Sequence, residues 1–475
     1  MLNLGFVLET LTDYRPTGHE PLVSSVVIDS RKARPGSVFV CFVGEKVDAH
    51  DFIMDAFERG AIAAIVERPG LPEGILVDSA KPWADQVSPD QLLPIPFQVL
   101  VGSSLEAIQT LGREWRKRFP ALRVIGITGS VGKTTTKELT HAVLSRRFNT
   151  LKSEGNYNNE IGLPLTLLRL RPWHQRAVLE MGMYTSGEIS LLCELAQPQI
   201  GVVTIVGAVH MEWLGSIEAI AAAKRELVEA LPPAPEGVAI LNRDDERVME
   251  MAGYTDASVV TYGLDSQADI WADHILSMGL NGIYFTLHHG RDSLNVQVPL
   301  LGRHSVHTAL RAAAVGLVEG LTWDEIVHGL QGLSSQLRLV AVPGPRNSIL
   351  LDDTYNSSPE SAIAALNLLN DLDGRRIAIL GDMLELGPVE EQSHRLVGRR
   401  AKDAADVIVA VGELGRLIGE EALAAGMPAD RVFLVKDAAE AVELLNDIIR
   451  NDDVVLVKGS RGVQLDRVVT ALGRA

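Results

Sequence analysis

The chain has 475 residues, too many for one ordinary hydrophobic core, and this length predicts two to four domains. Hydrophobic residues make up 46% of it and charged residues 22%, as in ordinary globular proteins. The formal net charge of -17 argues against nucleic-acid binding, which normally needs a basic face. It does not exclude anionic small molecules, because a local group of Lys and Arg can oppose the overall sign.

Cys41 and Cys193 are the only cysteines, too few for a disulfide framework, so we expect a cytoplasmic protein in which both thiols serve packing. The opening stretch "MLNLGFVLETLTDY" carries acidic residues and no basic n-region, so we expect no signal peptide. The sequence contains no uncharged apolar run of about eighteen residues, so we expect no membrane span. We expect a monomer that binds neither nucleic acid nor membrane.

Residues 1–98 predict a small α/β domain, because short β-rich segments alternate there with a helix-like stretch. The turn "ARPG" joins the first two strands, and the Pro-bearing stretch "DQLLPIPF" marks a boundary. The expected helix is 51–60, and the expected strands are 24–30, 37–44 and 61–67.

Residues 99–335 predict a central domain that opens with a helix at 103–119 and a strand at 123–128. Further apolar strands, with helical patterns between them, are expected at 176–182, 200–207 and 237–242. Such alternation is typical of a parallel sheet covered by helices on both faces.

Residues 336–475 predict a separate doubly wound, Rossmann-like domain, because the alternation is cleanest there. Expected strands are 375–382, 406–412, 431–437 and 453–460. Expected helices lie near 394–405, 413–425, 437–450 and 462–473. The fold class is therefore α/β with three domains.

The stretch "ITGSVGKTTTKE" at 127–138 looks like a phosphate-binding loop but departs from the usual spacing. The general pattern has a Gly five residues before the Gly-Lys pair, and here Ile127 stands at that distance before Gly132. The nearest glycines, Gly126 and Gly129, lie six and three positions before Gly132. The stretch is therefore either a variant nucleotide cradle or a glycine-rich turn followed by a surface lysine.

The flanking sequence favours the nucleotide cradle. A buried-type strand precedes the loop, and a helical pattern follows it, with two arginines in the expected last turn: Leu139, Val143, Leu144 and Phe148, with Arg146 and Arg147. Backbone N–H groups in such a strand-to-helix loop face an anion. We therefore predict that Lys133 neutralises the β- and γ-phosphates and that Thr134 places a hydroxyl on Mg²⁺.

Three polar residues follow apolar strands, where ligands of open α/β sheets bind: Glu180, His210 and Asn242. Phosphoryl transfer needs metal ions held by oxygen or nitrogen ligands near the γ-phosphate. A buried acid can instead form a structural ion pair, and a lone His is often a hydrogen-bonded core residue. Their shared position with Lys133 favours a functional interpretation.

Lys224 lies on the apolar stripe of the helical segment "SIEAIAAAKRELVEAL", which comprises Ile217, Ile220, Ala221, Leu227, Val228 and Leu231. Burying a bare ammonium there is costly. The side chain can extend its charge to the surface or pair with a carboxylate. Alternatively, CO₂ can carbamylate it and turn it into a carboxylate-like metal ligand, and the residue pattern alone leaves these solutions open.

Together these residues resemble the Mur ligase family, over nearly the whole chain. The resemblance rests on "TGSVGKTTTKE", "GNYNNEIGLPLTLL", "LEMGMYTSGEI", "VHMEWLGSIEAIAAAKRELVEAL", "ILNRDD", "LDDTYNSSPES", "ILGDMLELG" and "VKGSRG". The front block "VVIDSRKARPGSVFVCFVGEKVDAHDFI" resembles a uridine-nucleotide domain. With "GDMLELG", it favours the family member that adds a dipeptide.

The resemblance implies an ATP-dependent ligase with a uridine-nucleotide domain (1–98), a central ATP-binding domain with a phosphate loop (99–335) and a Rossmann-like domain (336–475). It implies that D-alanyl-D-alanine is joined to UDP-N-acetylmuramoyl-tripeptide through an acyl phosphate, in peptidoglycan precursor synthesis. Domain closure would exclude water from this intermediate. A sibling reaction with another amino acid or dipeptide is the alternative, and a nucleotide-dependent regulatory module without ligase chemistry is a second one.

The resemblance also assigns residues. The catalytic set is Lys133, Glu180, His210 and Lys224. Two Mg²⁺ ions are implied, one on Thr134 and Glu180 and one on His210 and N6-carboxylated Lys224. ATP-binding residues are Gly129, Ser130, Val131, Gly132, Lys133, Thr134, Thr135, Asn242, His304, Arg338 and Asp353. Substrate-binding residues are Ser30, Arg31, Lys46, His50, Asn159, Asn356, Ser358, Asp382, Lys458 and Arg461.

Two stretches depart from the family pattern. In "HSVHT", Ser305 and Thr308 replace the usual asparagines, which puts the adenine-side contacts in question. In "YNSSP", Ser358 replaces an asparagine expected to face the incoming dipeptide, and a Ser hydroxyl reaches less far than an amide. Asp382, Lys458 and Arg461 follow strands of the third domain, where surface charges without function are also common.

Overall fold

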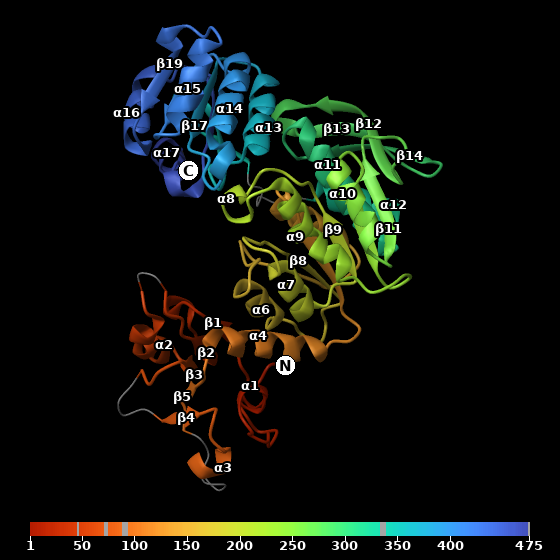
Figure 1. The fold of residues 1–475 in the computed structure, drawn as a ribbon, viewed down its shortest axis with the longest axis vertical. Helices are drawn as coiled ribbons and strands as arrows, with labels where there is room; N and C mark the ends of the chain where they lie inside the picture. Colours follow the sequence, from red (N-terminus) through yellow and green to blue (C-terminus); the bar gives the residue numbers. More distant parts are fainter. Residues whose placement is uncertain (45–46, 71–74, 88–93, 333–338, 474–475) are drawn as a thin grey trace. The chain divides into compact units, whose positions relative to one another are not determined.

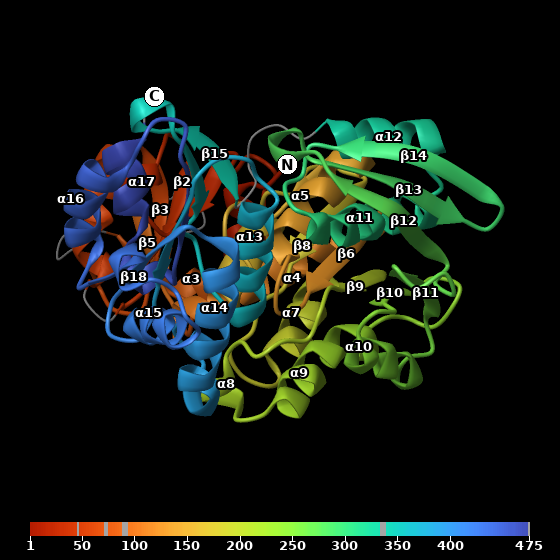
Figure 2. The same ribbon diagram turned by 90° about the horizontal axis from the view of Figure 1, so that it is seen from above.

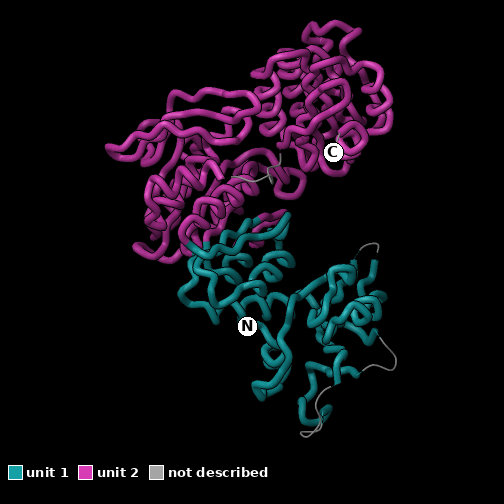
Figure 3. The backbone as a smooth tube through the Cα atoms, turned by 180° about the vertical axis from the view of Figure 1, so that it is seen from behind, with its two compact units in different colours: residues 1–124, 148–181, 190–198 teal, residues 125–147, 182–189, 199–475 magenta. Residues whose placement is uncertain are grey.

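The computed structural model describes residues 1–44, 47–70, 75–87, 94–332 and 339–473. The chain forms two compact units, shown in Figure 3. The first comprises residues 1–124, 148–181 and 190–198, and the second comprises 125–147, 182–189 and 199–475. The expected boundary near residue 335 falls outside the described residues. No helix in the described ranges is long and apolar enough to cross a membrane.

The first unit begins with a parallel sheet in the order β1-β2-β3-β5-β4. Every residue of β3, Ala61–Val66, is buried, which is typical of a parallel strand covered on both faces. Its elements are α1 (Leu4–Leu11), β1 (Ser25–Val27), β2 (Ser37–Val40), α2 (Ile53–Glu58), β3 (Ala61–Val66), β4 (Leu76–Asp78), α3 (Trp83–Gln86) and β5 (Phe97–Leu100). The predicted strands and helix of this region are confirmed.

The first unit continues through α4, a long amphipathic helix whose N-cap is Ser103. Beyond it, two short strands pair in parallel. These elements are α4 (Ser104–Lys117), β7 (Thr150–Lys152), α6 (Gly162–Leu167) and β8 (Arg176–Glu180), and α7 (Glu188–Ala196) runs across the division between the units. Cys41 and Cys193 are both buried.

The second unit contains strands hydrogen-bonded in the order β14-β13-β12-β11-β10-β9-β6. The strands are β6 (Arg123–Thr128), β9 (Ile200–Val203), β10 (Val238–Asn242), β11 (Ser258–Gly263), β12 (Ile270–Ser277), β13 (Ile283–His289) and β14 (Asp292–Val298). The helices of this part are α5 (Lys133–Leu144), α8 (Met211–Leu214), α9 (Ile217–Glu229), α10 (Glu246–Glu250), α11 (Val306–Val318) and α12 (Trp323–Gln331).

The predicted parallel central sheet is confirmed, and beyond β12 it continues as an antiparallel ribbon that the sequence reasoning did not predict. Strands β12, β13 and β14 are antiparallel neighbours. In β13 buried and partly exposed residues alternate, as they do when one face of an antiparallel ribbon is solvated. This period-two pattern, and not a βαβ pattern, extends the sheet beyond β11.

The helix after the loop is shorter than its pattern predicted. Helix α5 ends at Leu144, so Arg146 and Arg147 do not lie in its last turn, and Phe148 is not on its apolar face. The Arg147 guanidinium instead binds the carboxylate of Glu325, in the first turn of α12, and the carbonyl of Gly320. Helices α11 and α12 pack against α5 (Figure 2). Contacts with distant residues therefore hold the Arg147 side chain outside the helix.

The last part of the second unit has the strand order β15-β16-β20-β17-β18-β19. All pairs are parallel except β15 with β16. Its strands are β15 (Val340–Pro343), β16 (Ile349–Asp353), β17 (Arg376–Gly381), β18 (Val407–Val411), β19 (Val432–Val435) and β20 (Val454–Lys458). Its helices are α13 (Pro359–Asn370), α14 (Glu390–Ala404), α15 (Gly415–Ala424), α16 (Ala438–Ile448) and α17 (Asp466–Leu472).

Helices cover both faces of this sheet (Figure 1). One buried core joins the strands to α13, α14 and α15, and a second joins them to α16 and α17. This confirms the predicted doubly wound arrangement. Strand β20 lies between β16 and β17 and is parallel to both. The carboxyl end of β20 is therefore next to those of β16 and β17, although these strands are far apart in the sequence.

Candidate active site

The predicted phosphate loop connects buried strand β6 to helix α5, as the flanking sequence indicated. Gly132 is the N-cap of α5 and has a left-handed φ of 85°. Gly129 has a φ of 140°, and an ideal Cβ built on it would lie 1.8 Å from Oγ1 of Thr204. The glycine three positions before Gly132 is therefore required by close packing.

Hydrogen bonds attach this loop to the segment after β9. Ser130 donates its backbone N–H to the Ile205 carbonyl (2.8 Å) and its hydroxyl to the Gly207 carbonyl (3.0 Å). Thr204 Oγ1 donates to the Val131 carbonyl at 2.7 Å. Within the loop, Lys133 Nζ donates to the Gly129 carbonyl at 2.6 Å. These contacts fix the loop and hold the Lys133 ammonium above it.

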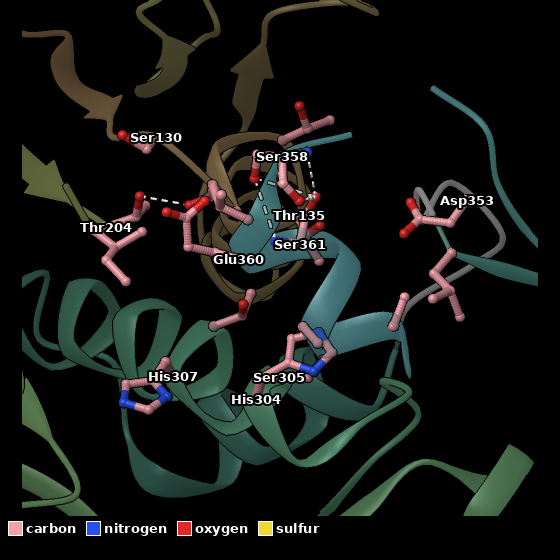
Figure 4. Close-up of a pocket in the computed structure, with 18 of the residues that line it drawn as sticks. Ser130, Thr135, Thr204, His304, Ser305, His307, Asp353, Ser358, Glu360 and Ser361 are labelled. Atoms are coloured by element: carbon pink, nitrogen blue, oxygen red, sulfur yellow. Dashed lines mark hydrogen bonds between the residues drawn. The ribbon is translucent and has the colours of Figure 1, made fainter. Parts of the chain in front are cut away.

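A cavity of about 440 Å³, a size that suits a small organic ligand, adjoins the loop (Figure 4). It brings together many of the predicted site residues: Ser130, Val131, Gly132, Thr134, Thr135, Asn242, His304, Asp353, Asn356, Ser358 and Lys458. The cavity does not include the predicted residues Gly129, Lys133, His210, Lys224, Asp382 and Arg461 of the same unit.

The cavity also has lining residues that the sequence reasoning did not single out, chiefly Thr204, Asp244, His307, Arg311, Glu360 and Ser361. Oε1 of Glu360 accepts a hydrogen bond from the Ala208 N–H at 3.3 Å. Asp244 Oδ2 and His307 Nε2 lie 2.7 Å apart. Asp244 follows Asn242 in "ILNRDD", so its position was a usable signal. Thr204 lies in the segment after β9, and the others lie on α11 and α13, whose packing the sequence does not reveal.

His304 and Asn242 lie on different elements of the cavity wall. The protein around the His304 imidazole, and then the positive charges of His307, Lys458 and Arg311, lower its pKa to about 4. The ring is therefore neutral at pH 7 and can accept a hydrogen bond. Asn242 Nδ2 donates to the Thr204 carbonyl at 3.0 Å, which ties the end of β10 to that of β9.

Asp353 and Lys458 form an ion pair at the adjacent ends of β16 and β20. Lys458 Nζ donates to Asp353 Oδ2 at 2.7 Å and to the Asn356 carbonyl at 3.0 Å. The lysine is 2% exposed, so the carboxylate compensates a buried charge. The resemblance assigned Asp353 to ATP binding and Lys458 to substrate binding, and in the structure the two side chains are paired with each other.

Ser358 is the N-cap of α13. Its hydroxyl accepts a hydrogen bond from the Ser361 N–H (3.3 Å), and its own N–H donates to Ser361 Oγ (2.9 Å), a reciprocal capping box. Pro359 occupies the first helical position, where its missing N–H costs nothing. A Ser at 358 therefore has a structural reason besides any contact with a substrate.

His210 is held by Glu385 from the "GDMLELG" segment, with 2.8 Å between Nδ1 and Oε2. Because a carboxylate only accepts, Nδ1 carries a proton, and in the neutral tautomer Nε2 then has the lone pair that a metal-binding histidine requires. Both residues have positive φ, 59° for His210 and 65° for Glu385. The Tyr184 ring meets the imidazole at a centroid distance of 5.0 Å.

Lys224 is 2% exposed, which confirms its inward position on α9. Burial, and then the positive charge of Lys133, lower the pKa of its amine well below the usual range. A neutral amine is a nucleophile, whereas an ammonium is not, so this environment suits carbamylation. Among the described residues, no three His, Cys, Asp or Glu side chains form a metal-binding group.

Of the predicted residues in the first unit, five are described. Glu180 ends β8, is 1% exposed and accepts a hydrogen bond from Asn158 Nδ2 at 2.9 Å. Asn159 Oδ1 accepts from the Gly162 N–H at 2.9 Å. Ser30 is buried beside Arg31, whose guanidinium donates two hydrogen bonds to Asp29.

Both ring nitrogens of His50 are occupied, Nδ1 with Asp48 Oδ1 at 2.6 Å and Nε2 with the Glu67 N–H at 3.1 Å. Asp382 Oδ1 accepts the N–H groups of Leu414 and Gly415 at the start of α15. Arg461 is exposed. Lys46 and Arg338 lie outside the described residues.

A parallel-stranded α/β core with a glycine-bearing loop between a buried strand and a helix defines a nucleotide-binding protein with a phosphate loop. Three family models match successive parts of the chain: the Mur ligase family catalytic domain at 22–93, the Mur ligase middle domain at 127–316 and the Mur ligase glutamate ligase domain at 338–461. The chain belongs to the Mur ligase family.

The relatives cover nearly the whole chain. The chain is 37% identical over 459 residues to the UDP-N-acetylmuramoyl-tripeptide–D-alanyl-D-alanine ligase of Synechocystis sp., covering 95% of this chain and 92% of that protein. The crystal structure of MurF from Acinetobacter baumannii matches with a TM-score of 0.82 and 30% identity, over 99% of this chain and 98% of that one. MurF ligase from Thermotoga maritima, in complex with ADP, matches with a TM-score of 0.76 and 27% identity, over 94% and 96%.

Gly129→Ala tests the close packing of the loop. The new methyl group would overlap Thr204 and force the loop backbone to move, so we expect ADP affinity to fall about tenfold or more, measured by calorimetry. Gly253→Ala, where a Cβ meets open space, is the matched control. A folded Gly129→Ala protein with unchanged ADP affinity would contradict the role of this contact.

Substitutions at Ser358 test the cap of α13. Ser358→Ala removes the acceptor for the Ser361 N–H and should lower the free energy of unfolding by about 1 kcal/mol, whereas Ser358→Asn should stay within a few tenths, since Asn also caps helices. Urea unfolding measures both. If both variants lost the same free energy of unfolding, the Ser358 hydroxyl would not stabilise the protein by capping α13.

Proposed function

We propose that this member of the Mur ligase family joins D-alanyl-D-alanine to UDP-N-acetylmuramoyl-tripeptide with hydrolysis of ATP to ADP and phosphate, in the synthesis of peptidoglycan precursors. The observation that carries the proposal is the match over 95% of the chain to a relative named for these substrates. The phosphate loop, its cavity and the ADP-bound relative support the use of ATP.

In the proposed reaction, the terminal carboxylate of the tripeptide attacks the γ-phosphate and forms an acyl phosphate, and ADP leaves. The amine of the dipeptide then attacks the acyl carbon, and phosphate leaves with formation of the amide. Lys133 balances the charge of the transferring phosphoryl group, and loop N–H groups orient it. The neutral imidazole of His304 and the Asn242 amide contact the adenine side. Asp353 and Arg338 contact the nucleotide from the third domain.

We propose two Mg²⁺ ions, with Thr134 and Glu180 as ligands of one and His210 and N6-carboxylated Lys224 as ligands of the other. The support comes from the free Nε2 of His210 and from the buried amine of Lys224, which can attack CO₂ and release a proton to give a carbamate. When bound, Mg²⁺ neutralises phosphate oxygens as charge develops in the transition state. Glu385 orients His210, and burial keeps Lys224 nucleophilic.

The same proposal assigns domains and substrate contacts. Residues 1–98 bind the uridine nucleotide, 99–335 bind ATP, and 336–475 complete the site. The substrate contacts are those of Ser30, Arg31, Lys46, His50, Asn159, Asn356, Ser358, Asp382, Lys458 and Arg461. The engaged ring nitrogens of His50 and the capping oxygen of Asp382 favour positioning roles for these two. We propose a cytoplasmic enzyme, because its two cysteines are buried thiols, and we propose that it is a monomer.

A sibling reaction with a different acceptor is the competing function, because Ser358 stands where the family usually has Asn. The capping role of Ser358 weakens this alternative, since the substitution has a reason within the chain. A regulatory module without chemistry is less well supported, since such a module needs no buried lysine beside a phosphate loop.

An acceptor panel tests the function. With UDP-N-acetylmuramoyl-tripeptide and ATP, we expect phosphate release to be stimulated by D-alanyl-D-alanine far more than by single amino acids or other dipeptides, measured by a coupled phosphate assay. Stimulation by another acceptor and not by D-alanyl-D-alanine would establish a sibling reaction. No release with any acceptor would favour the regulatory module.

Lys224→Ala tests the carbamate. We expect at least about a hundredfold loss of activity, because a ligand charge near the phosphates disappears, and partial recovery with short carboxylates such as formate. An independent readout is the ¹³C carbamate signal of wild-type protein in ¹³C-bicarbonate, which should be absent in Lys224→Ala. Full activity of the variant without added carboxylate would rule the carbamate out.

A further inference from the structure

Arg311 is a buried cation at the phosphate loop that neither the loop motif nor the predicted site includes. It lies on α11 and lines the cavity together with Gly132 and Thr134. An ideal Cβ built on Gly132 would lie 3.2 Å from Nη2 of Arg311, so the guanidinium reaches the N-cap of α5. The sequence places it in the interior of an apolar helix, where nothing marks it as part of a site.

The contacts of Arg311 leave its charge without a carboxylate. The side chain is 5% exposed. Nη2 donates to Thr308 Oγ1 at 2.7 Å, and the guanidinium lies 5.7 Å from the centroid of the Tyr262 ring. Nε is buried without a hydrogen-bond partner, and no acidic side chain in the described part of the chain forms an ion pair with Arg311.

A buried guanidinium without an anion is costly, and proteins usually compensate such a charge with a carboxylate. The nearby lysine follows this rule, because Asp353 neutralises buried Lys458 in the same cavity. The Arg311 guanidinium instead lies beside the N-terminus of α5 at Gly132, where backbone N–H groups favour an anion. An anionic ligand would supply the missing counter-charge.

We propose that Arg311 binds the phosphate chain of the nucleotide, on the side of the loop next to Gly132. The planar guanidinium would donate to phosphate oxygens from Nε and the Nη groups while Thr308 and Tyr262 hold its plane. Through Thr308, which occupies a position where the family usually has Asn, the contact links the adenine side of the cavity to the phosphates. The inference rests on the proposed use of ATP.

A purely structural arginine would have the same contacts with Thr308 and Tyr262. The Tyr262 hydroxyl donates to the Val203 and Thr204 carbonyls at 3.0 Å each, which fixes its ring. In a structural role, Arg311 would only pack against this fixed ring. The two roles differ in what they do to ligands. A phosphate contact discriminates ADP from adenosine, whereas a packing role affects both equally.

Calorimetric titrations of the full-length protein with ADP and with adenosine separate these roles. Arg311→Met keeps the length of the side chain and removes its charge. We expect ADP to bind about 10- to 100-fold more weakly and adenosine to change less than about threefold, since hydrogen bonds to charged groups are the interactions lost. Arg291→Met, in the exposed turn between β13 and β14, should leave both affinities unchanged.

Equal ADP affinities for wild-type and Arg311→Met proteins, or equal losses for ADP and adenosine, would overturn the inference. If Arg311→Met does not fold, Arg311→Lys, which keeps the charge but loses the planar fork, is compared in the same way, and it should still lose ADP affinity selectively. Failure of wild-type protein to bind ADP would instead contradict the proposed function itself.

Discussion

The close approach of the phosphate loop to the end of β9 is the constraint on which the rest of the site depends. Gly129 lies so near Thr204 that no side chain fits between them. The Thr204 hydroxyl donates a hydrogen bond to the Val131 carbonyl of the loop, and the Ser130 hydroxyl donates one to the Gly207 carbonyl in the segment after β9. Because these contacts fix the backbone, α5 begins at Lys133 with its first N–H groups beside the cavity.

The buried cations that line the adjoining cavity differ in how their charge is compensated. Some are compensated within the protein, such as Lys458 by Asp353, and they hold neighbouring strand ends together. Arg311 is different, because no carboxylate pairs with it in the described residues and it faces the helix N-terminus. An uncompensated buried cation favours the binding of an anion. The bound phosphate groups would then provide the negative charge that no carboxylate of the protein provides.

Much of the fold was predictable because its signals are local. Buried strands such as β6 and β18 are continuous apolar runs, and the alternation of strands and helices defines the doubly wound part. The antiparallel edge from β12 to β14 was missed, because its period-two pattern is weak and its strands depend on their neighbours. The end of α5 was also misjudged, since Arg147 leaves the helix to bind Glu325, a partner 178 positions away.

The sequence by itself determined the phosphate loop, the strand-to-helix order around it and the inward position of Lys224, because each depends on spacing along a single element. Only the tertiary structure decided which side chains complete the site. Arg311 reaches Gly132 because α11 packs on α5, Glu385 meets His210 across 175 positions, and the Ser358 hydroxyl caps α13. Contacts between elements distant in the chain leave no periodic trace in the sequence, so they appear only when the elements are packed together.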